Sequence, residues 1–289
     1  MDYFEYKSST ALDDVFSLLE DDQHETAVLA GGTDIVNHIR LGKRTPAQVV
    51  DIKNIKELKH MIEYSEDGLT IGALTTLTEV EFHPVIRKVF RALSESANKV
   101  GSRQIRNRGT IVGNICNASP AADTIPALLI YEAIVNIIGR GSRRSVPLES
   151  FITGPGKIDL NKGELVESIY LPVPPNDHTS CYLKLARREG ADLTTVGVSA
   201  LISKRGEVRI ALGAVGPKPF RAYTAEGLLS FEQRSERVIK SALEEAIKQA
   251  SPISDLRGSK EYRLAMVKVY IRKALDLCER RLKEEQLQS

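Results

Sequence analysis

Three glycine-rich turns are the segments of this chain best suited to holding a ligand. They read Ala30-Gly-Gly-Thr-Asp34, Gly109-Thr-Ile-Val-Gly-Asn114 and Gly154-Pro-Gly-Lys157. The first follows a predicted strand (26–30) and opens a predicted helix (33–41), where glycine permits positive φ and free N–H groups attract an anion. A diphosphate needs many converging donors, so two such loops suit it better than one, although each turn alone could be an ordinary tight turn. No G-x-G-x-x-G or G-x-x-x-x-G-K-[ST] pattern occurs, which argues against a Rossmann fold or a P-loop.

Charged side chains lie just before and after the second glycine turn. Arg103, Arg106 and Arg108 precede it and could hold phosphate or a partner's acidic surface, with a solvated basic loop as the alternative. Asp123 follows the turn, immediately before a predicted helix start at Thr124. Its carboxylate could cap that helix or accept hydrogen bonds from ribose or ribityl hydroxyls.

Composition and cysteine spacing exclude several classes of protein. The chain has 289 residues, with 40 Lys and Arg against 38 Asp and Glu, a balance that argues against a generally basic nucleic-acid binder. No apolar run approaches the ~18 residues of a membrane span, and the N-terminus lacks a secretory pattern. Cys116, Cys181 and Cys278 lie far apart, so a disulfide framework, a structural zinc site and an internal iron–sulfur cluster are not expected. These features predict a reduced, soluble, cytoplasmic protein without a bound metal.

The histidines show no metal-ligand spacing. All five stand apart, without an H-E-x-x-H pattern, and we expect most of them on the surface. Only His83, which precedes a proline, suggests a further role, as a helix cap. The sequence also lacks an obvious catalytic triad or acid–base dyad, which is typical of proteins whose redox chemistry is performed by a bound cofactor.

The predicted elements divide the chain into two α+β domains, residues 1–175 and 176–289, joined at the proline-rich stretch 172–175. The first domain alternates helices and strands. Its predicted helices cover 11–20, capped by Ser9 or Thr10, then 33–41, 84–100 and 124–131, and its predicted strands cover 26–30, 48–52, 69–71 and 133–138. Segments 164–171, 180–186, 195–203 and 208–215 have hairpin spacing and predict one antiparallel sheet. Helices follow at 222–229, 235–250 and 259–285.

Several ordered motifs resemble the flavin-binding subunit of molybdenum hydroxylases, a family that includes the medium subunit of aerobic carbon monoxide dehydrogenase and the flavin subunit of xanthine dehydrogenase. The motifs are Leu29-Ala-Gly-Gly-Thr-Asp34, Gln104-Ile-Arg-Asn-Arg-Gly-Thr-Ile-Val-Gly-Asn114, Ala118-Ser-Pro-Ala-Ala-Asp123, Arg140-Gly-Ser-Arg-Arg-Ser-Val-Pro147, Phe151-Ile-Thr-Gly-Pro-Gly-Lys157, Lys184-Leu-Ala-Arg-Arg-Glu-Gly-Ala-Asp-Leu193 and Ser254-Asp-Leu-Arg-Gly-Ser-Lys-Glu-Tyr-Arg263. Their order and spacing match the family over nearly the whole chain. The resemblance implies an FAD-binding domain of the vanillyl-alcohol-oxidase or PCMH type, followed by a C-terminal domain in which an antiparallel sheet packs with helices.

The resemblance also implies which residues hold FAD. The two glycine loops would line the diphosphate and its neighbouring groups through Ala27, Val28, Leu29, Ala30, Gly31, Gly32, Thr33, Asp34, Thr110, Ile111, Val112, Gly113 and Asn114. Asp123 matches the residue that bonds the sugar-alcohol chain of the cofactor. Val100, Val166 and Lys184 match further lining positions. Leu193 matches a position beside the isoalloxazine, where some relatives have a tyrosine.

The same resemblance implies an electron-transfer role in a complex. Its partners would be a molybdopterin-binding large subunit and a small subunit with two [2Fe–2S] clusters, with NAD or another acceptor taking the electrons from FAD. The third glycine turn and residues 192–195 are nearer to the xanthine dehydrogenase branch, and the cysteine-rich insert of the benzoyl-CoA-reducing branch is missing. A stand-alone flavoenzyme similar to UDP-N-acetylenolpyruvylglucosamine reductase is the alternative, and a scaffold that has lost its flavin is another.

Overall fold

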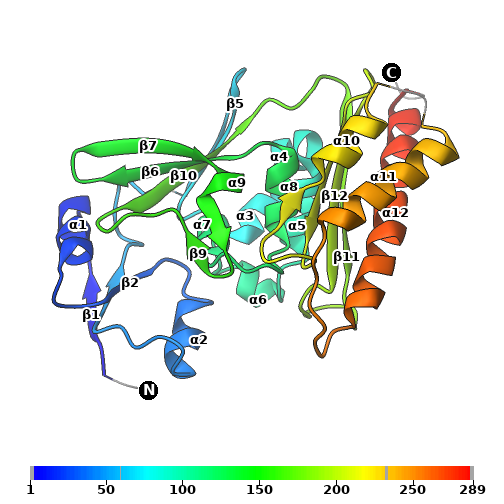
Figure 1. Cartoon of the computed structure of the whole chain (residues 1–289). Helices are drawn as coiled ribbons and strands as arrows, with labels where there is room; N and C mark the ends of the chain where they lie inside the picture. Colours follow the sequence, from blue (N-terminus) through cyan, green and yellow to red (C-terminus); the bar gives the residue numbers. More distant parts are fainter. Residues whose placement is uncertain (1–2, 59, 232–233, 287–289) are drawn as a thin grey trace.

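A small parallel sheet begins the chain. The computed structural model describes residues 3–58, 60–231 and 234–286, and Figure 1 shows their arrangement. Strands β1 (Glu5–Ser8), β3 (Gln48–Asp51) and β2 (Thr26–Leu29) pair in parallel in the order β1-β3-β2. Helix α1 (Leu12–Glu20) crosses from β1 to β2, and α2 (Ile35–Arg40) from β2 to β3. The expected cap of the first helix is wrong, because Ala11 is the N-cap residue and the Ser9 hydroxyl bonds to Asp14 instead.

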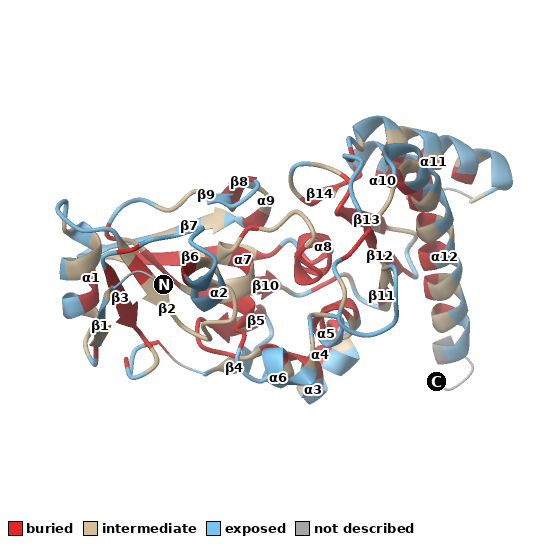
Figure 2. Cartoon of the chain, turned by 90° about the horizontal axis from the view of Figure 1, so that it is seen from below, coloured by how far each residue is buried: buried red, intermediate tan, exposed pale blue. Residues whose placement is uncertain are grey.

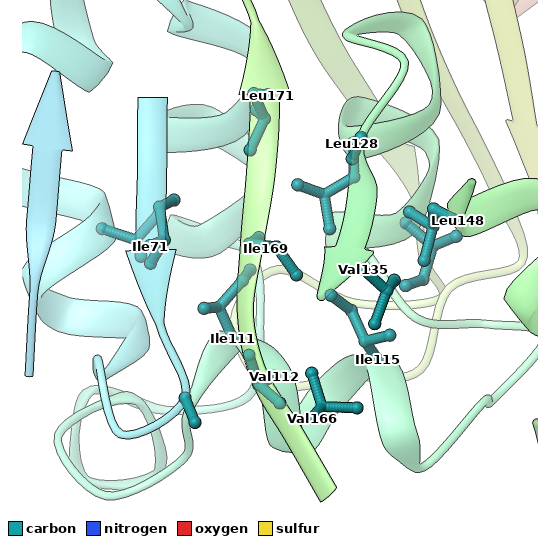
Figure 3. Packing of buried hydrophobic residues seen from close by; sticks show 14 of the residues in the cluster. Ile71, Ile111, Val112, Ile115, Leu128, Val135, Leu148, Val166, Ile169 and Leu171 are labelled. Atoms are coloured by element: carbon teal, nitrogen blue, oxygen red, sulfur yellow. The ribbon is translucent and has the colours of Figure 1, made fainter. Parts of the chain in front are cut away.

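A five-stranded antiparallel sheet forms the second layer. Its order is β4 (Ile62–Tyr64), β5 (Gly68–Gly72), β10 (Leu165–Pro172), β6 (Ile134–Gly139) and β7 (Ser142–Pro147). The prediction that residues 164–171 belong to the C-terminal sheet is therefore wrong. β10 pairs on both sides within this sheet, and Ile169 and Leu171 are fully buried in its core (Figure 3). The spacing between successive strands in the sequence indicates only whether neighbours along the chain could form a hairpin. It cannot reveal that a strand pairs with strands much earlier in the chain.

Six short helices follow β5, some of them packed between the two larger sheets and others at the surface (Figure 2). They are α3 (Leu77–Phe82), α4 (Pro84–Val89), α5 (Arg91–Asn98), α6 (Arg103–Arg106), α7 (Ile111–Cys116) and α8 (Thr124–Ile130). The single helix predicted over 84–100 is interrupted at Phe90, whose φ and ψ are −113° and 47°. The buried Phe90 ring packs edge-on against Tyr131 at 5.1 Å, so side-chain burial accompanies the break. His83 is the N-cap residue of α4 but makes no side-chain capping bond.

The C-terminal sheet lies between two helical layers. Its strands are β11 (His178–Leu185), β12 (Val196–Ser203), β13 (Val208–Gly213) and β14 (Phe220–Arg221), in that order. Leu201 and Ala211 join the N-terminal core on one face, whereas Ala200 and Ile202 pack in the core of the other face. That second face is covered by α12 (Lys260–Gln286), beside α10 (Tyr223–Leu229) and α11 (Glu236–Gln249). The three predicted C-terminal helices are confirmed to within two residues.

The third glycine turn belongs to a small hairpin. It joins β8 (Ile152–Gly154) to β9 (Lys157–Ile158), after the single turn of α9 (Leu148–Phe151). Gly156 has a φ of +66°, which explains the glycine at this corner. Across the part of the chain that is described, no helix is long and apolar enough to cross a membrane.

A buried arginine anchors the start of α12. Arg263 is 1% exposed, and its guanidinium donates to the carbonyls of Thr195 and Ala214 at 3.0 and 2.9 Å and to Asp255 at 2.6 Å. Arg257 also pairs with Asp255 and donates to the Thr194 carbonyl at 3.1 Å. These bonds lower the pKa of Asp255, with the Arg257 bond as the largest cause. The network fixes the segment that enters β12.

We expect Arg263→Met to lower the free energy of unfolding by roughly 2–5 kcal/mol, because two buried carbonyls lose their donor. Urea denaturation at a fixed excess of FAD measures the change. Arg272→Met is the matched control on the same helix, since Arg272 pairs only with exposed acids and should leave the midpoint close to wild type. Equal midpoints for the two variants would contradict the anchoring role.

Candidate functional site: a cofactor cavity between the domains

One large cavity lies where the parallel sheet, α7, β10 and the loop between β11 and β12 meet. Its volume is about 1280 Å³, above the roughly 300–1,000 Å³ of ordinary ligand pockets. Gly32 and Gly113 line it from the two glycine loops, Val166 lines it from β10, and Leu193 from the β11–β12 loop. The cavity can therefore take a ligand considerably longer than a single nucleotide.

The two glycine loops touch each other through their backbones. A Cβ atom on Gly31 would lie 1.9 Å from the carbonyl oxygen of Arg108, so only glycine fits there. Gly32 has a φ of +80°, as a tight turn requires. Asn117, following α7, donates to the Asp34 carboxylate at 3.1 Å and ties the loops together. Gly31 thus serves the contact between the loops, in addition to any contact with a ligand.

The second loop is held by the segment that connects β5 to α3. The Leu77 N–H donates to the Gly109 carbonyl at 2.9 Å, and the Ile111 N–H to the Thr75 carbonyl at 3.1 Å. The Thr110 hydroxyl caps α7 by accepting from the Gly113 N–H at 2.9 Å. This loop is consequently fixed before any ligand arrives, which lowers the entropy lost on binding.

Asp123 is a buried carboxylate at the cavity wall, with donors from the C-terminal domain. Its Oδ1 accepts from the hydroxyls of Tyr182 and Thr194, both at 2.6 Å. Its Oδ2 accepts from Lys184 Nζ at 2.9 Å. Burial raises the pKa of Asp123, and the Lys184 ammonium is the largest influence opposing that rise. Asp123 makes no side-chain capping bond to α8, so the capping alternative is wrong.

Asp123 still has hydrogen-bonding capacity toward the cavity. A carboxylate offers about four acceptor positions, and the three donors leave one of them. No motif in the sequence marks Tyr182 or Thr194 as a site residue. Tyr182 lies on β11 and Thr194 in the following loop, and only the fold brings them to Asp123. Sequence reasoning missed both residues.

The structure gathers most of the predicted site residues around this cavity. Those that line it are Ala27, Val28, Ala30, Gly31, Gly32, Thr33, Asp34, Val100, Thr110, Val112, Gly113, Asn114, Asp123, Val166 and Leu193. Three others do not line it. Ile111 is fully buried in the core beside β10 (Figure 3), Leu29 packs in a small cluster with Ile39, and Lys184 reaches Asp123 and the Lys99 carbonyl.

Other lining residues were missing from the prediction. Segments 21–25 and 158–165 border the cavity, as do Lys43 and Arg44. His24 and His38 also line it, and the prediction gave neither a role. Most of these residues lie on irregular loops, where neither periodicity nor a motif marks them, whereas His38 lies on α2.

The three arginines before the second loop do not act together. Arg106 is 8% exposed, and its Nε bonds to Glu81 at 2.8 Å, so neither alternative, a contact with phosphate or a partner or a solvated loop, holds for it. Arg103 lies over the Phe82 ring at 4.8 Å. None of the three is among the described residues that line the cavity. In the described ranges, no group of three or more His, Cys, Asp or Glu side chains could hold a metal ion.

Comparison with known proteins shows the family of this chain and its cofactor. Residues 2–174 match the model of the FAD binding domain in molybdopterin dehydrogenase. The chain belongs to the FAD-binding subunits of the molybdenum hydroxylases. Residues 181–277 of this flavoprotein match the carbon monoxide dehydrogenase flavoprotein C-terminal domain. These matches confirm the predicted fold class and the predicted cofactor, FAD.

Individual relatives of this FAD-binding subunit cover almost its whole length. It is 32% identical over 280 residues to the putative xanthine dehydrogenase FAD-binding subunit of Escherichia coli K12, with 95% of each chain covered. It is 29% identical to the carbon monoxide dehydrogenase medium chain of Hydrogenophaga pseudoflava, covering 94% of this chain and 96% of the relative. A solved structure of that organism's carbon monoxide dehydrogenase matches with a TM-score of 0.91 at 29% identity, covering 97% of this chain and 98% of the other. The predicted class, an oxidoreductase subunit, is confirmed.

We expect Gly32→Asp to abolish stoichiometric FAD binding without unfolding the subunit. The new carboxylate would enter the cavity wall, where charge repulsion and lost N–H contacts each cost on the order of 1–3 kcal/mol, about 30-fold or more in affinity together. Flavin absorbance per mole of purified protein measures the outcome.

Gly141→Asp is the matched control, because Gly141 also has positive φ, +70°, and lies in the turn between β6 and β7, away from the cavity. It introduces the same side chain with similar backbone strain. A Gly32→Asp protein that keeps as much FAD as Gly141→Asp would remove the first loop from the binding site.

Proposed function

We propose that this chain is the electron-transfer subunit of a molybdenum hydroxylase complex, taking electrons from a [2Fe–2S] subunit and delivering them to NAD or another acceptor. The observation that carries the proposal is the match to a relative named as a putative xanthine dehydrogenase FAD-binding subunit. The alignment covers 95% of this chain and 95% of the relative. The family matches also support our division of the chain near residue 175. When bound, FAD supplies the ability to accept electrons and to release them to a second partner.

The residues of the cavity fit this cofactor. Gly32 and Gly113 leave both loops without side chains at these positions of the wall, so a diphosphate can approach the loop backbone closely. Asp123 retains one acceptor position for a hydroxyl of the sugar-alcohol chain. Val100 and Val166 supply apolar wall for a ring system, while Lys184 acts indirectly by holding Asp123.

The β11–β12 loop is suited to admitting an electron acceptor. Leu193 is 62% exposed at the cavity edge, where a tyrosine in some relatives would present a larger ring. Asp192 pairs with Arg187 at 3.0 Å, and Arg257 holds the Thr194 carbonyl, so the loop is braced on both sides of Leu193. A braced loop with a small exposed side chain leaves the edge of the site open to solvent.

The proposed function requires two partner subunits, one for substrate hydroxylation and one for electron transfer to this chain. Substrate would be hydroxylated on a molybdopterin-binding large subunit, and a small subunit with two [2Fe–2S] clusters would carry electrons to this chain. A [2Fe–2S] cluster needs four protein ligands, and the three cysteines here are dispersed, with only Cys181 and Cys278 in contact at 3.6 Å. The three free thiols support a cytoplasmic location.

We expect FAD to be bound without a covalent bond to the protein. Cys116 is the cysteine that lines the cavity, and burial raises the pKa of its thiol to about 12, so little thiolate is available to attack the flavin. Acid precipitation should release all flavin into the supernatant, from wild type and from Cys116→Ala alike. Flavin that stays with the precipitated wild-type protein would contradict this expectation.

The proposed role is tested by comparing the isolated FAD-loaded chain with the chain co-expressed with its two partner subunits. The isolated chain should have no hydroxylase activity and at most slow NADH-driven reduction of dyes. In the complex, substrate oxidation should reduce the flavin, as measured by bleaching of its absorbance. Turnover of a physiological substrate by the isolated chain at about 10 per second, a typical enzyme rate, would favour the stand-alone reductase instead.

A further inference from the structure

Positive charge is concentrated in one segment of an otherwise balanced chain. Residues 83–123 carry seven basic side chains and two acidic ones, whereas the whole chain has a net charge of +2. Both acids are already engaged: Asp123 with Lys184 at 2.9 Å, and Glu95 with Arg281 at 2.7 Å and Arg91 at 3.2 Å. Of the basic residues, Arg106 is neutralised by Glu81. The remaining cations therefore give this segment a positive surface.

The exposed part of that surface lies on short helices at one side of the molecule. Figure 2 shows α3, α4 and α6 together there, with much of their surface exposed. Arg87 and Lys88 come from α4, Arg103 from α6, and Arg108 follows α6. We call these four residues, together with Phe82, the basic face. Within the described ranges, Lys88, Arg103 and Arg108 form no ion pair.

Two guanidinium groups of the basic face share one aromatic ring. Arg87 lies 4.9 Å and Arg103 4.8 Å from the centre of the Phe82 ring, which is 39% exposed. The ring holds both cations in defined positions. Two like charges on one ring repel each other, and an anionic partner would relieve that repulsion. Exposed arginines and aromatic rings are also the residues that most often dominate protein interfaces.

The basic face is next to the cofactor cavity but is not part of it. Gly101 and Ile105, on either side of Arg103 in the sequence, line the cavity, and Ile105 is itself 39% exposed. The cations of the basic face do not line the cavity, so they are not placed to hold the diphosphate. A protein docked on this face would lie beside the site of the flavin.

We propose that the basic face is the docking surface for the [2Fe–2S] subunit, an inference that rests on the proposed function. A [2Fe–2S] cluster held by four thiolates is anionic, because the thiolates and sulfides together outweigh the charge of the two irons. A partner whose cluster approaches the flavin therefore presents negative charge near this side of the cavity. Complementary charge speeds association and fixes the orientation of the complex.

The test compares two charge reversals in the FAD-loaded chain. Arg103→Glu/Arg108→Glu reverses two charges of the basic face, and Arg237→Glu/Lys240→Glu reverses two exposed charges on α11 as a matched control. Association with the purified [2Fe–2S] subunit is measured by stopped-flow or surface plasmon resonance at 0.1 M and 1 M salt, and FAD content by absorbance.

At 0.1 M salt we expect the basic-face variant to associate about tenfold or more slowly than wild type, and the control to stay within about twofold. The difference should shrink at 1 M salt, where the Debye length falls from about 10 Å to about 3 Å. FAD content should be equal in all three proteins. If loss of the Phe82 stack unfolds the first variant, Lys88→Glu/Arg108→Glu leaves both stacked arginines in place and carries the same expectation.

Three outcomes would overturn the inference. Wild-type association rates in a folded basic-face variant would remove the basic face from the interface while leaving the subunit function intact. Unchanged association with impaired NADH-driven dye reduction would make the face a nucleotide site. Failure of the wild-type chain itself to bind the [2Fe–2S] subunit would remove the proposed function, and the docking surface with it.

Discussion

One buried carboxylate joins the two domains at the cofactor site. Asp123 stands at the start of α8, and the three side chains that donate to it come from β11 and the loop that follows. Burying a carboxylate is costly unless donors surround it, so the C-terminal sheet must keep its place against α8. That placement also positions Leu193 at the edge of the cavity. The geometry of the cavity therefore depends on an interdomain contact as much as on the glycine loops.

Local sequence patterns were sufficient to locate the loops but not to explain them. The glycine turns were predicted at the right places, and most of their residues line the cavity. The sequence explained only part of the need for glycine at position 31. The atom that leaves no room for a Cβ there is the backbone carbonyl oxygen of Arg108, 77 positions later in the sequence. Periodicity similarly predicted a helix across Phe90, where the helix is interrupted and the buried ring packs against Tyr131. In both cases the residue makes a tertiary contact that no pattern within a short window of the sequence shows.

Charge was the least predictable property of the site. Arg103, Arg106 and Arg108 look equivalent in the sequence. In the structure Arg106 is buried and pairs with Glu81, whereas Arg103 stacks on the Phe82 ring at the surface. Tyr182, one of the three donors to Asp123, stands in β11 with nothing in the sequence to distinguish it from its neighbours. The family resemblance implied Lys184 as a residue lining the cofactor, whereas in the structure its ammonium bonds to Asp123 and does not line the cavity. The sequence therefore indicated several of the charged residues near the cavity but not the contacts that each of them makes.

The central position of β10 has a consequence for biosynthesis. Its neighbours β5 and β6 leave the ribosome first, and each must wait for residues 165–172 before its inner edge is paired. Unpaired strand edges invite association with other nascent chains. Val166, part of the cofactor cavity, also arrives with β10. The five-stranded sheet, and the part of the cavity wall that β10 supplies, therefore cannot be complete before residue 172 has been synthesised.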